Sequence, residues 1–253
     1  MSVKIKSKSE ISKMSECGKI IAEVRELIIK NIEPGISTWE LDKLAEEYTV
    51  SKGFVPAFKG YQNFPSSICT SINDEVVHGL PSKNKVLKNG DIIGIDFGVF
   101  DGTFYADSAF TFAVGNVDEE VTKLLHVTKS SLEKGIDKAV VGNKIYDISK
   151  AIQDYIESYG FSVVRTYVGH GIGRNLHEEP HVPNFILSKK DRSSSIKLKE
   201  GMVLAIEPMV NTGDYEVELS DDKWTVKTKD GSLSAHFEHT VAITKDGPKI
   251  LTN

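Results

Sequence analysis

The amino-acid sequence contains an internal repeat. Residues 34–54 align with residues 141–161 at a constant offset of 107. The matched pairs include Gly35 with Gly142, Trp39 with Tyr146, Tyr48 with Tyr155, Gly53 with Gly160 and Phe54 with Phe161. Each stretch has the apolar spacing of one helix that ends at a glycine, and Ser37 and Glu40 have the spacing of a capping box. A chain that repeats a structural unit in this way is expected to form two similar halves.

A second repeat places two apolar runs at equivalent positions. Residues 87–96 align with residues 198–207 at an offset of 111, and both runs end in a carboxylate, Asp96 and Glu207. The runs are short and rich in β-branched residues, which favours buried strands over helices. An acidic residue at the end of a buried strand needs a physical explanation.

The order of these elements predicts the fold class. Helices are also expected from about Ser9 to Ile32 and from about Asp118 to Val140, so that each half contains two helices and then strands. We therefore expect an α+β fold. Because no linker rich in Pro or Ser separates the halves, residues 1–253 are expected to form a single domain, with pseudo-symmetric halves of about 9–115 and 116–250.

A predicted hairpin brings two carboxylates together. Asp101-Gly102 lies between β-forming residues, which is a strong signal for a two-residue turn. With that turn, Asp96 and Asp107 would lie directly opposite each other, with Cβ atoms about 5 Å apart. Two ionised carboxylates at this distance repel each other, so either one is protonated or a cation lies between them.

The second half of the sequence offers comparable side chains. Glu207 ends the repeated strand, and Glu238 lies in residues 235–243, which we expect to form another strand. His170 lies between two glycines, which allow close approach of backbone and ligand. Each of these residues alone could be a strand cap, a solvated charge or a hydrogen-bonded core histidine. Together, four strand acids and one histidine favour a metal centre.

The sequence also contains a misleading motif. Residues 177–181 match the pattern H-E-x-x-H, which binds zinc only when both histidines share one face of an unbroken helix. Pro180 and Pro183 would break that helix. A different match is more informative, because residues 78–81 align with residues 177–180 at an offset of 99. Each half then offers one histidine, His78 and His177, in an equivalent context.

Composition narrows the class of protein. The formal net charge is −5 and no block of basic residues is present, which gives no indication of a nucleic-acid or membrane-surface site. Two cysteines, Cys17 and Cys69, cannot form a disulfide framework, which suggests a reducing compartment. No window reaches the apolar length of a signal sequence or a membrane span. We therefore expect a cytoplasmic protein.

Several motifs together resemble one enzyme family. They are Gly169-His170-Gly171-Ile172-Gly173, His177-Glu178-Glu179-Pro180, the pair Asp96 and Asp107, Ile206-Glu207-Pro208, and Phe237-Glu238-His239-Thr240. From about Ser9 to its C-terminus the sequence resembles the bacterial-type, type I methionine aminopeptidases. The resemblance implies the pita-bread (creatinase-like) fold, an antiparallel sheet flanked by two helix pairs in a two-layer α/β arrangement, which would account for the repeat.

The resemblance also implies two divalent metal ions per chain. Asp107 and Glu238 would bridge the ions, Asp96 would complete one site, and His170 with Glu207 would complete the other. Four carboxylates and one imidazole suit Mn²⁺, Fe²⁺, Co²⁺, Zn²⁺ or Ni²⁺, and the lack of a thiolate argues against a structural zinc. A metal-activated hydroxide would then attack the scissile carbonyl, as at other two-metal sites.

Further residues take roles from the same resemblance. Glu207 would accept the proton of the water, His177 would hydrogen-bond the carbonyl oxygen, and His78 would face the scissile nitrogen. The methionine pocket would be formed by Tyr61, Phe64, Cys69, Leu176 and Trp224, although each of these could instead be plain core. Ser108 and His236 stand where the family usually has Thr and Gln. His236 is expected to lie near the metals, with a solvent-facing edge position as the alternative.

The implied function is removal of the initiator methionine from nascent polypeptides whose second residue is small. The partners would be nascent N-termini near the ribosome, and the protein would be a monomer. One alternative is an Xaa-Pro aminopeptidase or prolidase on the same fold, although such relatives generally carry an additional N-terminal domain, and only 95 residues precede Asp96. Another is a non-catalytic binding protein, against which the intact ligand set argues.

Overall fold

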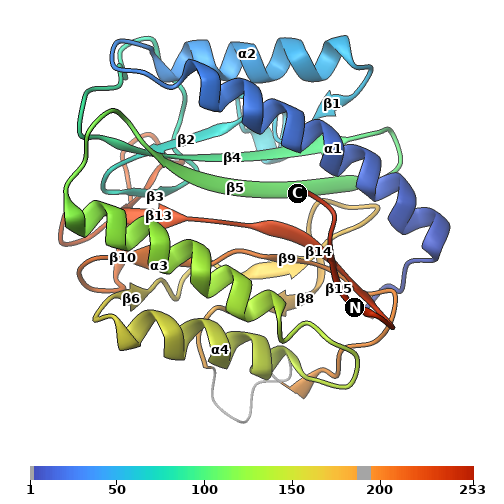
Figure 1. Cartoon of the computed structure of the whole chain (residues 1–253). Helices are drawn as coiled ribbons and strands as arrows, with labels where there is room; N and C mark the ends of the chain where they lie inside the picture. The colour runs from blue at the N-terminus through green and yellow to red at the C-terminus, as the bar shows by residue number, and fades with distance from the viewer. Residues whose placement is uncertain (1–2, 187–194) are drawn as a thin grey trace.

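The structure, a computed structural model, describes residues 3–186 and 195–253. In this part of the chain four α-helices form two pairs, one near each end of the molecule in Figure 1. The helices are α1 (Lys8–Asn31), α2 (Thr38–Ser51), α3 (Glu119–Ile136) and α4 (Ile145–Ser158). The expected α+β fold with two helix pairs is confirmed.

The repeat found in the sequence is visible in the helix boundaries. Helix α2 and helix α4 begin and end at positions that differ by 107 in number. Ser37 caps α2 through the predicted capping box with Glu40. In the second half the side chain of Asp147 accepts a hydrogen bond from the backbone N–H of Lys144, at the position equivalent to Ser37. Local capping chemistry therefore sets these ends in both halves.

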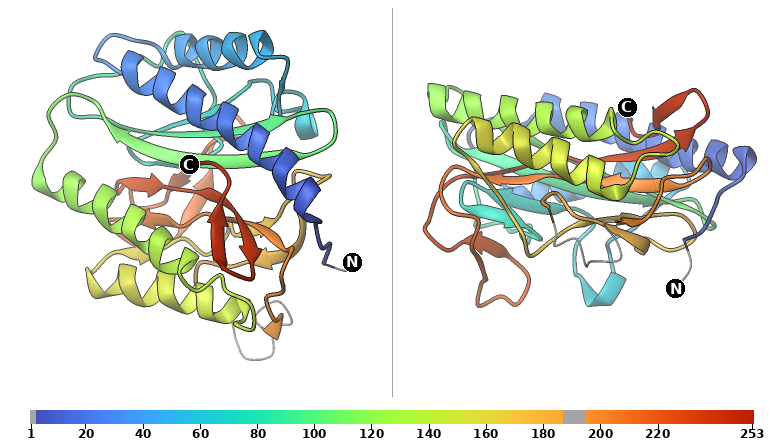
Figure 2. Two further views of the ribbon diagram at one scale, coloured as in Figure 1. Left: turned by 45° about the vertical axis from the view of Figure 1, so that its right-hand side comes forward. Right: turned by 90° about the horizontal axis from the view of Figure 1, so that it is seen from below.

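Within the described residues, antiparallel strands form four small sheets beneath the helices. Figure 2 shows that the four helices lie on one face of the strands and that several long loops lie on the other face. In chain order the strands, with one 3₁₀ turn, are β1 (Val55–Pro56), η1 (Tyr61–Asn63), β2 (Cys69–Ile72), β3 (Glu75–Val77), β4 (Ile92–Phe100), β5 (Tyr105–Ala113), β6 (Ser162–Val163), β7 (Gly169–Gly171), β8 (Glu178–Val182), β9 (Val203–Ile206), β10 (Met209–Asn211), β11 (Val217–Leu219), β12 (Val226–Thr228), β13 (Ser234–His236), β14 (His239–Thr244) and β15 (Gly247–Ile250).

Two strand predictions need correction. Asp96 does not end its strand, because β4 continues to Phe100. Phe97 and Val99 are fully buried, so the apolar pattern extends beyond the carboxylate. Residues 235–243 do not form one strand either, because β13 and β14 are separated at Phe237 and Glu238.

The predicted register of the β4–β5 hairpin is wrong by two residues. Asp96 lies opposite Ala109, and Asp107 lies opposite Gly98. The turn is longer than two residues because Asp101 Oδ1 accepts hydrogen bonds from the N–H groups of residues 103 and 104. A shift of two residues preserves the face of the sheet, so the two carboxylates remain diagonal neighbours on one face.

Two of the four hydrophobic clusters among the described residues lie beneath the helix pairs. One lies under α1 and α2 and contains residues of β4 and β5. The other lies under α3 and α4 and contains residues of β9 and β14. Phe237 packs against both clusters, at the junction of the two halves. The metal-site residues predicted from the sequence lie along this junction.

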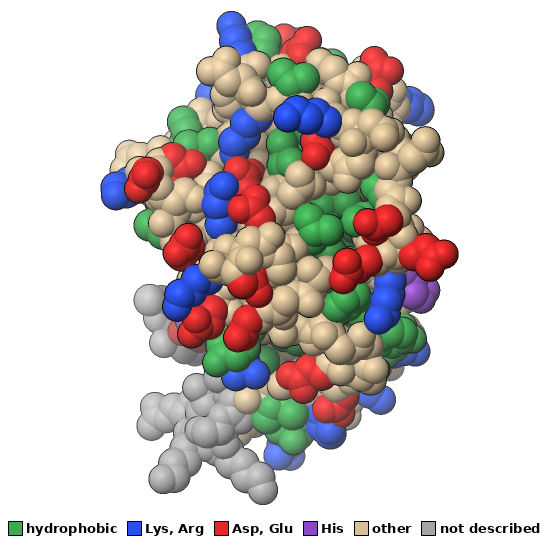
Figure 3. Space-filling model, turned by 90° about the vertical axis from the view of Figure 1, so that its left-hand side faces the viewer, with side chains coloured by type: hydrophobic (Ala, Val, Ile, Leu, Met, Phe, Trp, Pro, Cys, Tyr) green, Lys and Arg blue, Asp and Glu red, His purple; other side chains and the backbone are tan. Residues whose placement is uncertain are grey.

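The surface carries charges of both signs. On the face shown in Figure 3, acidic side chains are interspersed with lysines and arginines. No helix in residues 3–186 and 195–253 combines the length and hydropathy that crossing a membrane requires.

Candidate active site

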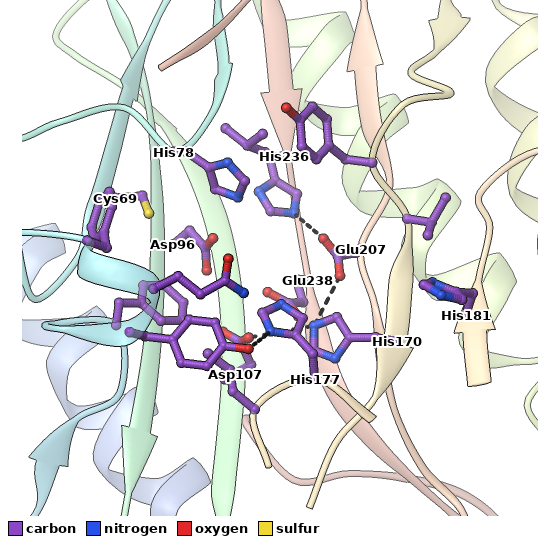
Figure 4. A pocket seen from close by; sticks show the side chains of 18 of the residues that line it. Cys69, His78, Asp96, Asp107, His170, His177, His181, Glu207, His236 and Glu238 are labelled. Carbon is purple, nitrogen blue, oxygen red and sulfur yellow. Dashed lines mark hydrogen bonds and ion pairs between the residues drawn. The ribbon is translucent and has the colours of Figure 1, made fainter. Parts of the chain in front are cut away.

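One cavity of about 530 Å³ collects the residues that the sequence singled out. Its lining includes both large apolar side chains and a group of acids and histidines, as Figure 4 shows. All twelve predicted site residues line it: Tyr61, Phe64, Cys69, His78, Asp96, Asp107, His170, Leu176, His177, Glu207, Trp224 and Glu238.

The predicted metal ligands come from five different places in the sheets. Asp96 lies in β4, Asp107 in β5 and His170 in β7. Glu207 directly follows β9, and Glu238 lies in the break between β13 and β14. Ligand atoms of Asp107, His170 and Glu238 all lie within 4.8 Å of one another, in a group that could hold a metal ion.

Side-chain hydroxyls fasten the two halves together behind these carboxylates. Thr240 Oγ1 donates to the backbone carbonyl of Asp107 at 2.8 Å and accepts from its N–H at 2.9 Å. Ser108 Oγ donates to the carbonyl of Glu238 at 2.6 Å. The N–H of Glu238 donates to the carbonyl of Ala109 at 2.8 Å, which explains why the strand is interrupted there. These bonds hold Asp107 and Glu238 side by side.

His170 is positioned by close backbone packing at its two flanking glycines and by a hydrogen bond of its ring. A Cβ atom on Gly169 would lie 2.4 Å from the carbonyl oxygen of Ala205, and one on Gly171 would lie 2.3 Å from that of Glu179. The His170 Nδ1 atom is 2.9 Å from the carbonyl oxygen of Gly171, which places the ring proton on Nδ1 and leaves Nε2 free as a ligand.

The Nε2 atom of His170 points toward the acids. It lies 3.5 Å from Glu207 Oε1 and 3.9 Å from Asp107 Oδ2. Burial lowers the pKa of His170 to about 3, so the imidazole is neutral at physiological pH, as a metal ligand must be.

Without a bound cation, the buried carboxylates of the site are unfavourable in their charged form. Burial raises the pKa of Asp107 to about 7. Burial, followed by repulsion from the neighbouring carboxylates, raises the pKa of Asp96, Glu207 and Glu238 well above the ordinary range. Oxygens of Asp96, Asp107 and Glu238 are buried without a hydrogen-bond partner among the described residues. Divalent cations would supply both the missing partners and the missing positive charge, so the donor set fits them.

Two further histidines lie at the edge of this cluster. The hydroxyl of Tyr61 is 2.8 Å from Nδ1 of His177, and the ring centroids of His177 and His170 are 4.3 Å apart. His78 has a left-handed backbone, with φ of 59°, and burial lowers its pKa to about 4. Strained backbone conformations of this kind concentrate at functional sites. The two histidines that the offset of 99 placed in equivalent contexts thus line one cavity.

The apolar side of the cavity is made of packed side chains. Phe64 and Trp224 meet edge to face with centroids 5.1 Å apart, and Leu176 is buried beside them. Cys69 lies directly opposite Asp96 in β2, and burial raises the pKa of its thiol, so it remains a neutral sulfur. The cavity therefore has a charged end and a soft apolar end.

His236 is buried and does not face solvent. Its Nε2 lies 3.7 Å from Glu207 Oε2, and burial lowers its pKa to about 3. His236 therefore lies beside the acidic cluster, and the solvent-facing alternative is wrong. It ends β13, and the strand is interrupted between it and β14. Its backbone is held by Thr111, whose hydroxyl bonds both its N–H and its carbonyl.

The sequence did not predict part of the cavity wall. Thr166, Tyr167 and Val168 line it, and the Tyr167 ring meets His78 edge to face at 5.3 Å. Their place directly before the Gly-His-Gly segment was the available signal. The zinc motif at residues 177–181 is excluded as expected, because Glu178–Val182 forms strand β8 and His181 lies on it.

The fold and this site define a class: proteins that hold a divalent metal at a buried cluster of acids and histidine, next to an apolar pocket. The sequence profile of metallopeptidase family M24 matches residues 12–245. The chain belongs to this metallopeptidase family.

The chain is similar over its full length to curated members of the family. It is 52% identical over 248 residues to the methionine aminopeptidase of Clostridium acetobutylicum. The aligned residues cover 98% of each chain. It is 50% identical over 247 residues to methionine aminopeptidase 1 of Bacillus subtilis, again with 98% of both chains covered. The crystal structure of methionine aminopeptidase from Thermotoga maritima matches with a TM-score of 0.96 and 45% identity, over 100% of each chain.

The fold extends to more distant proteins. The Xaa-Pro dipeptidase from Bacillus anthracis matches with a TM-score of 0.76 and 23% identity, over 98% of this chain but 62% of the dipeptidase. This likeness shows a shared fold alone, and it confirms the expected pita-bread architecture.

Proposed function

We propose that the protein is a metal-dependent methionine aminopeptidase of type I, which removes an N-terminal methionine when the second residue is small. The observation that carries this proposal is the cavity with two unlike ends. Its acidic end fits divalent cations, and its apolar end, lined by Phe64, Leu176 and Trp224, fits an unbranched thioether side chain. The methionine aminopeptidases that match over the full length support the same activity.

The proposed metal centre uses the five predicted ligands. Asp107 and Glu238 would bridge two ions, Asp96 would complete one, and His170 with Glu207 would complete the other. When bound, such ions lower the pKa of a water and polarise a carbonyl oxygen. The identity of the ions remains one of Co²⁺, Mn²⁺, Fe²⁺, Zn²⁺ and Ni²⁺, since the donor set suits all of them.

The remaining polar residues would handle protons and orientation. The carboxylate of Glu207 would accept the proton of the attacking water. His177 would donate a hydrogen bond to the oxygen of the scissile carbonyl, with Tyr61 fixing the ring from the other nitrogen. His78 would face the scissile nitrogen from across the cavity.

Replacing His177 by Ala is expected to lower kcat by about 10²–10³-fold, the usual value of a donor to a developing oxyanion. The KM for Met-Ala-Ser should change much less, because the interaction strengthens only in the transition state. Steady-state kinetics of the metal-loaded variant measures both values. A kcat within about threefold of the parent would remove His177 from this role.

The pocket is expected to favour methionine over β-branched side chains. Val and Ile are stiff at χ1 and cannot adapt to the packed apolar wall of the cavity, which includes Phe64 and Trp224, as an unbranched chain can. We expect kcat/KM for Met-Ala-Ser to exceed that for Val-Ala-Ser by at least about tenfold. Apolar pockets typically discriminate by about 10–200-fold. Comparable values would indicate an aminopeptidase of broad specificity.

The alternative activity is tested with a proline peptide. The metal-loaded protein should hydrolyse Met-Ala-Ser at least about 100-fold faster than Ala-Pro-Ser, again within the discrimination of a shaped pocket. Faster cleavage of Ala-Pro-Ser would assign the protein to the Xaa-Pro peptidases instead. Absence of any cleavage with intact metal content would support the non-catalytic alternative.

The wider setting follows from this proposal. We place residues 1–253 in one catalytic domain with halves of about 9–115 and 116–250, supported by the shared junction of the two cores. The substrates would be the N-termini of nascent chains, met by a monomer near the ribosome in the cytoplasm.

A further inference from the structure

The loop between β7 and β8 carries two proposed site residues, Leu176 and His177. Its far end is fixed by Glu178, whose side chain is only 2% exposed. Glu178 Oε1 accepts hydrogen bonds from the backbone N–H groups of Arg174 at 3.0 Å and Asn175 at 3.2 Å. The carboxylate of Glu178 therefore closes the loop on itself, directly beside His177.

A lysine from the beginning of the chain completes this arrangement. Lys6 Nζ lies 2.8 Å from Glu178 Oε2, and the Lys6 side chain is 5% exposed. The backbone N–H of Lys6 donates to the carbonyl of Gly201 at 2.7 Å, so the lysine is anchored independently of its charge. A Cβ on Gly173 would lie 2.4 Å from Lys6 Cε, which shows that the lysine stem fills the space under the loop.

A second ion pair joins the same two segments. Arg174 Nη2 lies 3.0 Å from Glu10 Oε1, and Glu10 also forms the capping box of α1 with Ser7. Lys4 reaches Glu178 as well, at 3.3 Å, but its side chain is 52% exposed. Among these contacts, the bond between Lys6 and Glu178 is the buried one, where water cannot replace a lost partner.

Both members of the buried pair are charged in this setting. Burial alone would raise the pKa of Glu178, but the hydrogen bond and charge of Lys6, together with the N–H of Asn175 and the charge of Lys4, outweigh it and lower that pKa. Burial lowers the pKa of Lys6, and Glu178 opposes this effect. Removal of the lysine would leave a carboxylate that is buried, charged and deprived of its strongest donor.

We propose that Lys6 is a positioning residue for catalysis, which acts by holding Glu178 and thereby the loop that presents His177 to the scissile carbonyl. This inference rests on the proposed function for the role of His177. We call the contacts of Lys6 with Glu178, and of Glu178 with the loop backbone, the clamp. The clamp is a property of the fold and can be tested without measuring activity.

The kinetic test compares Lys6→Met with Lys4→Met. Methionine keeps most of the length of the buried apolar stem and removes the ammonium group, with its charge and its hydrogen bonds. Lys4 contacts the same carboxylate from the surface. We expect Lys6→Met to lower kcat on Met-Ala-Ser by at least about tenfold with KM changed less, and Lys4→Met to stay within about twofold of the parent. In a His177→Ala background, Lys6→Met should have no further effect on kcat, because the residue through which it acts is gone.

A second comparison separates the charge from the packing. Lys6→Met combined with Glu178→Gln should recover part of the lost kcat, because the amide oxygen of Gln can still accept from Arg174 and Asn175 without an unpaired charge. If Lys6→Met leaves kcat within twofold of the parent, or lowers it by the same factor in the His177→Ala background, the proposal is overturned.

Hydrogen exchange tests the clamp independently of any reaction. In Lys6→Met, the amides of residues 172–178 should exchange at least about tenfold faster than in Lys4→Met, while the amides of α3 stay unchanged. Unchanged exchange of the loop would overturn the proposal. If the parent cleaves no methionine peptide, the proposed function fails and the exchange result still decides whether Lys6 holds the loop. If Lys6→Met does not fold, as judged by circular dichroism, Lys6→Gln takes its place under the same criteria.

Discussion

Replacing Glu207 by Gln should lower kcat on Met-Ala-Ser by more than about 10³-fold, since it removes a proton acceptor, typically worth about 10²–10⁴-fold, and a charged ligand as well. Replacing His78 by Ala should cost less, because that ring only faces the scissile nitrogen. The measurement is kcat at saturating substrate, with the bound metal counted for each variant so that loss of ions and loss of chemistry are separated.

His78 needs a control for its backbone. Its φ of 59° lies in the left-handed region, where Asn is better tolerated than Ala. His78→Asn therefore keeps the backbone while removing the imidazole. If His78→Asn and Glu207→Gln lose kcat equally, the proton acceptor has been assigned to the wrong residue.

Replacing Glu238 by Gln should have opposite effects on activity and on the stability of the metal-free protein. Activity should fall by more than about 100-fold, which is the upper end of the loss seen when a residue that merely supports a ligand is changed. The metal-free variant, however, should melt at a higher temperature than the metal-free parent at pH 8. The reason is that Glu238 is 2% exposed and burial, together with the charges of Asp107, Glu207 and Asp96, opposes its ionisation.

The pH dependence of this gain follows from linkage. The pKa of Glu238 is raised in the folded protein, so between the unfolded value near 4.5 and the folded value the native state holds a proton that the unfolded chain has lost. Rising pH therefore destabilises the metal-free parent, and Gln has no proton to lose. The difference in melting temperature should be small at pH 5 and increase toward pH 8, by about 2–4 °C for each kcal/mol. A gain that is equal at both pH values, or a loss at pH 8, would contradict this account of the acids.

Local chemistry allowed the sequence to predict the helices well. The offset of 107 reproduced the ends of α2 and α4, because caps and terminal glycines are decided within a few residues. The second repeat, at an offset of 111, placed Asp96 and Glu207 at equivalent positions of the two halves, and both side chains line the same cavity.

Strand details could not be predicted, because distant partners decide them. The break at Glu238 exists because its backbone N–H bonds Ala109 in the other half of the molecule. The hairpin register differs from the predicted one because the side chain of Asp101 accepts hydrogen bonds from two backbone N–H groups of the turn. The periodicity of the sequence does not indicate such bonds. The link between Lys6 and Glu178 spans 172 positions of sequence and was not foreseen at all.

The most direct test of the central claim is the removal and return of metal. We expect exhaustive chelation to abolish cleavage of Met-Ala-Ser and to lower the melting temperature, because the facing carboxylates lose the cations that separate them. Stepwise addition of Mn²⁺ or Co²⁺ should restore both, with activity complete at two ions per chain by elemental analysis. Full activity from protein shown to contain far less than one ion per chain would contradict the account.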